Sequence, residues 1–123
     1  MAAERIQTFA EFWPYYVGAH RKPLNRALHY VGTSCAVGCV GAGVLTGNWL
    51  FFLAAPVVGY GPAWLGHFFV EGNQPATFGH AGFSLMADFK MLGHALQGKM
   101  DDEVTRLFGS PNPAPDAPLL ATR

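Results

Sequence analysis

The chain has 123 residues, the length of a single domain, and 50% of its residues are hydrophobic while only 13% are charged. An ordinary soluble domain has roughly 25% charged residues, so the composition points away from that class. The formal net charge is zero, so the composition gives no electrostatic footprint of a nucleic-acid partner and none is expected.

Residues 5–20 are predicted to form an amphipathic helix, because aromatic and aliphatic side chains recur there at helical spacing. Pro14 interrupts this pattern and predicts a kink or an early stop. Basic residues beside a membrane span favour the cytoplasmic side. A basic cluster of this kind follows the helix at Arg21, Lys22 and Arg26.

The next segment, from Ala27 to Val70, contains no charged residue. It is too long for one membrane span of about 20 residues and suits two spans joined by a turn. The first span is predicted from Leu24 to Thr46 and is rich in small residues four positions apart, which let membrane helices approach closely. The second is predicted from Asn48 to Glu71, after a turn at Gly47-Asn48.

The uncharged run also has a soluble interpretation, as a helical hairpin buried in a globular core. We disfavour it because the rest of the chain has too little polar surface to cover such a hairpin. Cys35 and Cys39 lie four residues apart in this run, where a disulfide would strain a helix. We interpret both as reduced packing residues.

Residues 72–80 are predicted to form a loop, and residues 81–98 a third helix. That helix carries Asp88, Lys90 and His94, so we expect it to lie against the others or at the membrane interface. Residues 101–108 would continue it as a short helix, and the Pro-rich residues 110–123 are predicted to be disordered. The expected fold is an all-α integral membrane bundle, residues 1–109, with a central two-span hairpin flanked by amphipathic helices.

Histidine is frequent for so short and apolar a chain, and the hairpin brings two of the histidines together. His29 precedes the turn by roughly 27 Å and His67 follows it by roughly 30 Å, at 1.5 Å per helical residue. His20 and His80 flank the same end of the bundle, so four histidines are expected to converge there. Neutral imidazole suits iron, zinc, copper and nickel alike. We interpret His94 as a surface residue or as one that supports the ligands.

Other polar residues are expected near the histidines. Glu71 lies four positions after His67 on the same face and is a candidate ligand, a carboxylate that orients a histidine, or a solvated helix end. Arg26 lies three positions before His29 and could bind a substrate carboxylate or lipid headgroups. Asn25 and Asn73 are candidate substrate-binding residues whose alternative roles are caps and turns, and caps or turns also account for Asp88.

Three stretches carry a resemblance to a known family. They are the sequence LHYVGT at residues 28–33, the sequence GYGPAWLGHFFVEGNQPATF at residues 59–78, and the sequence FSLMADFKM at residues 83–91. With a Tyr16-to-His20 start, they are similar to the membrane-bound, Fe(II)-dependent 2-hydroxy fatty acid dioxygenases of α-oxidation. Phe83 replaces a usual tryptophan, and Ala81-Gly82 stands where the family often has a proline after the histidine.

The resemblance implies an oxidoreductase that uses Fe(II) and O2 to convert a long-chain 2-hydroxy fatty acid into the acid one carbon shorter. It implies His20, His29, His67 and His80 as metal ligands. We take His29, His67 and Glu71 as the candidate catalytic residues. The expected setting is a lipid bilayer, the bacterial inner membrane or a eukaryotic endoplasmic reticulum, with a second copy of the chain as a candidate partner. Two alternatives are a bis-histidine haem protein that uses His29 and His67, and a non-enzymatic membrane scaffold.

Overall fold

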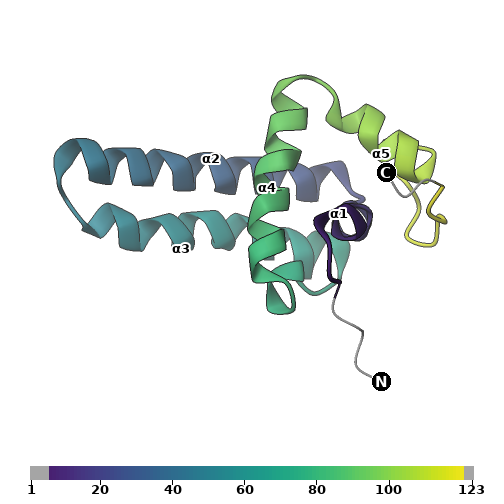
Figure 1. Cartoon of the computed structure of the whole chain (residues 1–123), viewed down its shortest axis with the longest axis horizontal. Coiled ribbons are helices and arrows are strands. Elements are labelled where there is room, and N and C mark those ends of the chain that lie inside the picture. The colour runs from purple at the N-terminus through teal and green to yellow at the C-terminus, as the bar shows by residue number, and fades with distance from the viewer. Residues whose placement is uncertain (1–5, 121–123) are drawn as a thin grey trace.

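A computed structural model describes residues 6–120, and in this part of the chain every regular element is a helix (Figure 1). Residue 5, where the first helix was predicted to begin, and residues 121–123 of the predicted tail lie outside the described residues. The elements in chain order are α1 Phe9–Gly18, α2 Pro23–Thr46, α3 Leu50–Leu65, the π-helix η1 Gly66–Glu71, the 3-10 helix η2 Ala76–Phe78, α4 Ala81–Leu96 and α5 Met100–Phe108.

The helices α2 and α3 form a long antiparallel hairpin that extends away from the other helices (Figure 1). Its turn is at the predicted place, where Gly47 takes a left-handed φ of 71° and Asn48 Oδ1 accepts a hydrogen bond from Leu50 N at 3.1 Å. A Cβ atom on Gly32 would lie 2.5 Å from the carbonyl oxygen of Gly59, so the two backbones touch at this level. A side chain at position 32 would force them apart.

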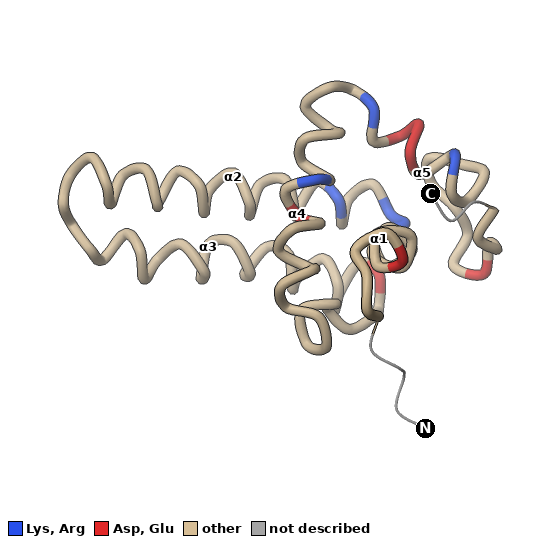
Figure 2. The backbone as a smooth tube through the Cα atoms, viewed as in Figure 1, with Lys and Arg blue, Asp and Glu red and all other residues tan. Residues whose placement is uncertain are grey.

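The outer part of the hairpin is apolar and exposed. Figure 2 shows no Lys, Arg, Asp or Glu in the outer part of the hairpin; those of the described residues lie on α4 and around the other helices. Val44 and Leu45, near the turn, are 70% and 88% exposed. Exposed apolar surface on this scale marks a surface that contacts a membrane or another protein.

The length of the two hairpin helices differs. Among the described residues, α2 is the one helix long and apolar enough to cross a membrane. The second predicted span, Asn48 to Glu71, is divided into α3, which ends at Leu65, and the π-helix η1. The structure therefore shows an all-α fold with one candidate span, and the two-span arrangement is taken up below as a proposal.

The buried core lies outside the hairpin, where α1, α4 and α5 meet. Its members come from all three helices and include Phe12, Trp13, Tyr16, Val17, Met91, Val104 and Leu107. α1 continues through Pro14 to Gly18, so the predicted early stop does not occur. The Trp13 indole, on the buried face of α1, donates from Nε1 to Glu103 Oε2 of α5 at 2.6 Å.

The C-terminal part of the chain returns toward α1. α5 is separate from α4 because Gly98, with a left-handed φ of 69°, turns the chain between them. Beyond α5, Pro113 is buried, and Arg21 Nη1 donates to the carbonyls of Ala114 and Ala117 at 2.6 and 3.0 Å. The disorder predicted for residues 110–123 concerns the chain in solution and stays a prediction.

We predict that Gly32→Ala destabilises the protein by about 1–3 kcal/mol, because its Cβ would overlap the backbone oxygen of Gly59. Gly38→Ala is the matched control in the same helix. A Cβ there meets no atom within 4 Å, so the gain in helix propensity should raise stability by up to about 1 kcal/mol. Thermal unfolding in detergent, followed by circular dichroism, measures both. Equal effects of the two substitutions would contradict the close approach of α2 and α3.

Candidate metal centre

Three buried histidines from three different elements meet at the inner end of the hairpin. His20 follows α1, His29 is in the second turn of α2, and His67 is in η1. Their ring centroids are 4.3 to 4.8 Å apart, and one ligand atom from each lies within 4.8 Å of the other two. His29 and His67 thus reach the same depth, as their distances from the turn predicted.

Each of these rings has one nitrogen fixed by an oxygen atom. His20 Nδ1 lies 2.6 Å from the carbonyl of Tyr16, and His29 Nδ1 lies 2.9 Å from the carbonyl of Asn25. His67 Nδ1 lies 2.7 Å from Asn73 Oδ1. A carbonyl oxygen can only accept, so each Nδ1 carries the proton. The Asn73 amide is oriented by its own Nδ2, which donates to the carbonyl of Ala19 at 3.0 Å, so its oxygen is the atom that faces His67.

The remaining nitrogens therefore carry lone pairs. His20 Nε2 and His29 Nε2 are 3.0 Å apart, and in the neutral rings neither has a proton to donate. The pKa of His20 is held well below its ordinary value, mainly by burial and to a lesser extent by the neighbouring His29 and His67. Protonation of His20 is therefore unfavourable and does not readily remove this repulsion.

A metal ion fits this donor set. At the roughly 2.0–2.1 Å of zinc–imidazole bonds, two nitrogens at a right angle to each other lie about 3 Å apart. A histidine that binds a metal through one nitrogen almost always donates the other N–H to a carbonyl, carboxylate or water. All three histidines have that arrangement, and imidazole accommodates several transition metals.

The π-helix places His67. A π-turn is rare and is frequent at functional sites. At its start, a Cβ atom on Gly66 would lie 2.0 Å from Asn25 Oδ1, so only glycine lets η1 pass this close to α2. At its end, Gly72 has a left-handed φ of 75° and Asn73 N donates to the carbonyl of His67 at 2.9 Å. Asn73 thus holds His67 by both main chain and side chain.

Glu71 lies beside the histidines but outside their group of three. Its Oε1 accepts from the main-chain N–H of Lys22 at 2.6 Å and from Asn25 Nδ2 at 3.4 Å. Lys22 is the N-cap of α2 and makes no side-chain cap of its own, so Glu71 supplies an acceptor there. The carbonyl that orients His67 comes from Asn73, and a catalytic role for Glu71 stays a prediction.

Arg26 is buried, and its guanidinium is occupied by the protein. Nη1 donates to the carbonyls of His20 and Arg21, each at 2.8 Å, and Nη2 donates to the carbonyl of Pro111 at 2.7 Å. Nη2 also lies 3.6 Å from Asp101. These contacts fix the segment that carries His20, and the binding of a substrate carboxylate by Arg26 stays a prediction. The substrate-binding roles predicted for Asn25 and Asn73 also stay predictions.

The other two histidines are not in the group of three. His80 Nε2 accepts from Ile6 N at 3.0 Å, and its ring packs beside Phe12 and Tyr15. The fourth-ligand role predicted for His80 stays a prediction. His94 is in α4, where its ring packs 5.7 Å from that of Trp13.

Sequence reasoning missed the roles of Tyr16 and Asp88. The Tyr16 ring stacks on that of His20 at 4.1 Å, and its hydroxyl donates to Asp88 Oδ1. Burial raises the pKa of Asp88 to about 6, against the opposing effect of the Tyr16 hydroxyl. The spacing of four residues between Tyr16 and His20 was a usable signal for a shared face, whereas nothing in the sequence paired Tyr16 with α4.

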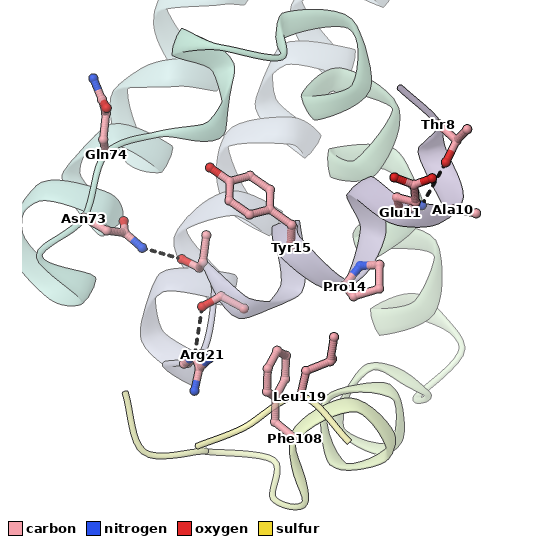
Figure 3. Close-up of a pocket in the computed structure, with 12 residues that line it drawn as sticks. Thr8, Ala10, Glu11, Pro14, Tyr15, Arg21, Asn73, Gln74, Phe108 and Leu119 are labelled. Atoms are coloured by element: carbon pink, nitrogen blue, oxygen red, sulfur yellow. Dashed lines mark hydrogen bonds between the residues drawn. The ribbon is translucent and has the colours of Figure 1, made fainter. Parts of the chain in front are cut away.

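Two cavities in the described part of the chain bear on the site. The larger, about 890 Å³, lies outside α1 between Asn73, Phe108 and Leu119 (Figure 3), and none of the three histidines lines it. The smaller, about 580 Å³, lies between α2, α3 and α4 and is lined by His29 and Asp88. Of these two cavities, the smaller reaches the histidine group, at His29.

Residues 6–100 match the family model described as 2-hydroxy-palmitic acid dioxygenase Mpo1-like. No curated protein and no solved structure matches the chain.

We predict that His20→Ala, His29→Ala and His67→Ala each lower metal affinity by more than about 100-fold, beyond the 10–100-fold expected for loss of an orienting partner. Metal bound per protein, measured by mass spectrometry after loading in detergent, tests this. His94→Ala is the control and should retain metal. His80→Ala separates a three-ligand from a four-ligand site. Full metal content in the three variants would refute the site, provided that circular dichroism shows them folded.

Proposed function

Because the chain belongs to the family of Mpo1-like 2-hydroxy-palmitic acid dioxygenases, we propose that it oxidises a long-chain 2-hydroxy fatty acid at an Fe(II) ion held by His20, His29 and His67. The observation that carries the proposal is the buried group of three histidines, each with one ligand atom within 4.8 Å of the other two, in which the lone pairs of His20 Nε2 and His29 Nε2 lie 3.0 Å apart. The use of O2 in the family's reaction favours iron among the metals that imidazole binds.

The proposed net reaction is RCH(OH)COOH + O2 → RCOOH + CO2 + H2O. It balances without an external reductant, because the bond between the carboxyl carbon and C2 breaks and the substrate supplies all four electrons that O2 accepts. Iron, when bound, would supply coordination positions for the substrate carboxylate, its 2-hydroxyl and O2. Three histidine ligands leave such positions open.

The protein's own groups would then orient the reactants and handle protons. The carbonyls of Tyr16 and Asn25 keep two rings in the tautomer that binds metal. Asp88 lines the same cavity as His29 and has a pKa of about 6, so at neutral pH its carboxylate could take up the proton of a substrate hydroxyl. The hydroxyl of Tyr16 holds that carboxylate in place.

The apolar hairpin supports a membrane setting. We propose that residues Leu50–Glu71, α3 with η1, cross the bilayer beside α2, since both helices expose aliphatic and aromatic side chains along their length. A long-chain acid dissolved in the bilayer would then reach the site laterally. The basic residues Arg21 and Lys22 before α2 support a cytoplasmic position for the histidine end.

The two alternatives fit the geometry less well. A haem between His29 and His67 would need a flat space the size of a porphyrin, but His20 Nε2 lies 3.0 Å from His29 Nε2 and occupies it. In a non-enzymatic scaffold, histidines that only join helices would be expected to donate hydrogen bonds to one another. Here each Nδ1–H instead donates to a carbonyl oxygen, and the lone pairs of His20 Nε2 and His29 Nε2 face each other.

We predict that the protein in lipid nanodiscs, loaded with Fe(II) under anaerobic conditions and then given O2, converts 2-hydroxypalmitate into the acid with one carbon fewer and releases CO2. His29→Ala and His67→Ala should abolish turnover, because each removes a ligand from a helix that is stabilised by apolar residues. His94→Ala should retain it. Product analysis by mass spectrometry, with and without a chelator, is the measurement. Undiminished turnover under chelation would rule out the iron mechanism.

For topology, we predict that position 48 faces the side opposite the cytoplasm. In a variant with Cys35 and Cys39 replaced by alanine, Asn48→Cys should react with a membrane-impermeant maleimide only from the outer or lumenal side. Asp102→Cys, at an exposed position of α5, should react only from the cytoplasmic side. Cytoplasmic labelling at position 48 would exclude the hairpin orientation.

A further inference from the structure

The smaller cavity runs along the hairpin as a groove. The residues of α2 that line the groove recur three and four positions apart, so they lie along one face of the helix. They are His29, Thr33, Ala36, Val37, Val40 and Gly41. Ala63, Gly59 and Ala55 of the antiparallel α3 face the same space in the reverse order. The groove therefore follows the helix axes from the histidines toward the turn.

Polarity changes along this groove. At the histidine end it is lined by His29, Asp88 and Tyr60. Toward the turn its lining is apolar, with Val40 and Gly41 on α2 and Pro56 on α3. Side chains of α4, which crosses the hairpin near its inner end in Figure 1, line the groove close to the histidines. One end thus suits an acid headgroup and the other a hydrocarbon.

The groove also has a defined length. His29 and Gly41 are separated by roughly 18 Å at 1.5 Å per residue. A fully extended polypeptide advances about 3.6 Å per residue, which is about 1.2 Å for each of its three backbone bonds. An extended hydrocarbon chain advances by about the same distance per bond. The groove therefore accommodates about 15 bonds, which is close to the length of a palmitoyl chain.

We propose that this groove binds the hydrocarbon chain of the substrate, with the carboxyl end at His29 and Asp88 and the methyl end at Val40 and Gly41, and that its length sets the chain-length preference. The inference rests on the proposed function, since it takes the occupant to be a 2-hydroxy acid. Three observations support this occupant over a bilayer lipid or a neighbouring helix: continuity with the histidine site, the polarity gradient and the length.

Gly41→Leu tests the proposal directly. A Cβ at Gly41 meets no atom within 4 Å, so the leucine would enter the open end of the groove without moving the backbone. We expect the ratio of kcat/KM for 2-hydroxypalmitate to that for 2-hydroxydodecanoate to fall about tenfold, since each buried methylene lost weakens binding about fourfold. Gly38→Leu is the matched control, because Gly38 has equal space, lies outside the groove and should leave the ratio unchanged.

A second measurement does not depend on turnover. A 2-hydroxy acid with a diazirine at its methyl end, added to the wild-type protein in nanodiscs, should after illumination label the residues that line the outer part of the groove, namely Val37, Val40, Gly41, Ala55 and Pro56. Labelling on the outer face of the hairpin or in the larger cavity would overturn the proposal. So would the same labelling pattern from a phospholipid with an identical photoreactive chain, because the groove would then be a general lipid contact.

The two experiments separate the failure of this inference from that of the proposed function. Wild-type turnover with an unchanged chain-length ratio in Gly41→Leu would overturn the groove and leave the dioxygenase intact. Labelling of the groove without turnover of any 2-hydroxy acid would refute the dioxygenase and leave an acid-binding groove.

Discussion

The arrangement of the site depends on the repulsion between the lone pairs of His20 Nε2 and His29 Nε2, which no hydrogen atom separates. Three imidazoles donate their Nδ1–H groups to fixed carbonyl oxygens, and the remaining nitrogens of His20 and His29 meet lone pair to lone pair at 3.0 Å. Burial disfavours the protonated form of His20, the ordinary remedy for such a contact. A metal ion bound here would turn the repulsion into bonding, and the rest of the fold holds the rings in this arrangement.

Each helix outside the hairpin contributes to that restraint. α1 delivers the Tyr16 carbonyl and places the Ala19 carbonyl where Asn73 can bind it. The Arg26 guanidinium joins the carbonyl of His20 to that of Pro111 in the C-terminal segment. The buried core between α1, α4 and α5 is thus a support for the histidines at one end of an otherwise thin hairpin.

Sequence reasoning captured what depends on regular helix geometry. The turn at Gly47, the extent of α2 and the shared depth of His29 and His67 all follow from counting residues along helices. Sequence reasoning did not predict contacts that involve main-chain atoms. The cap that Glu71 supplies to α2 and the carbonyls that orient the histidine rings are of this kind, and no residue type marks them in a sequence. Sequence reasoning also did not predict that the second span is divided into α3 and a π-helix. One extra residue in a single turn changes the 3.6-residue periodicity too little to be recognised.

The π-helix has a consequence for how this sequence can change. A π-turn holds one residue more than the α-helical turn it replaces, so deleting Phe68, Phe69 or Val70 would leave a regular helix. Every side chain beyond the deletion would then rotate by about 100° about the axis. Asn73 would turn away from His67 although neither had been replaced. Insertions and deletions in this short segment are therefore more damaging than most substitutions, and its length is as much a part of the site as its chemistry.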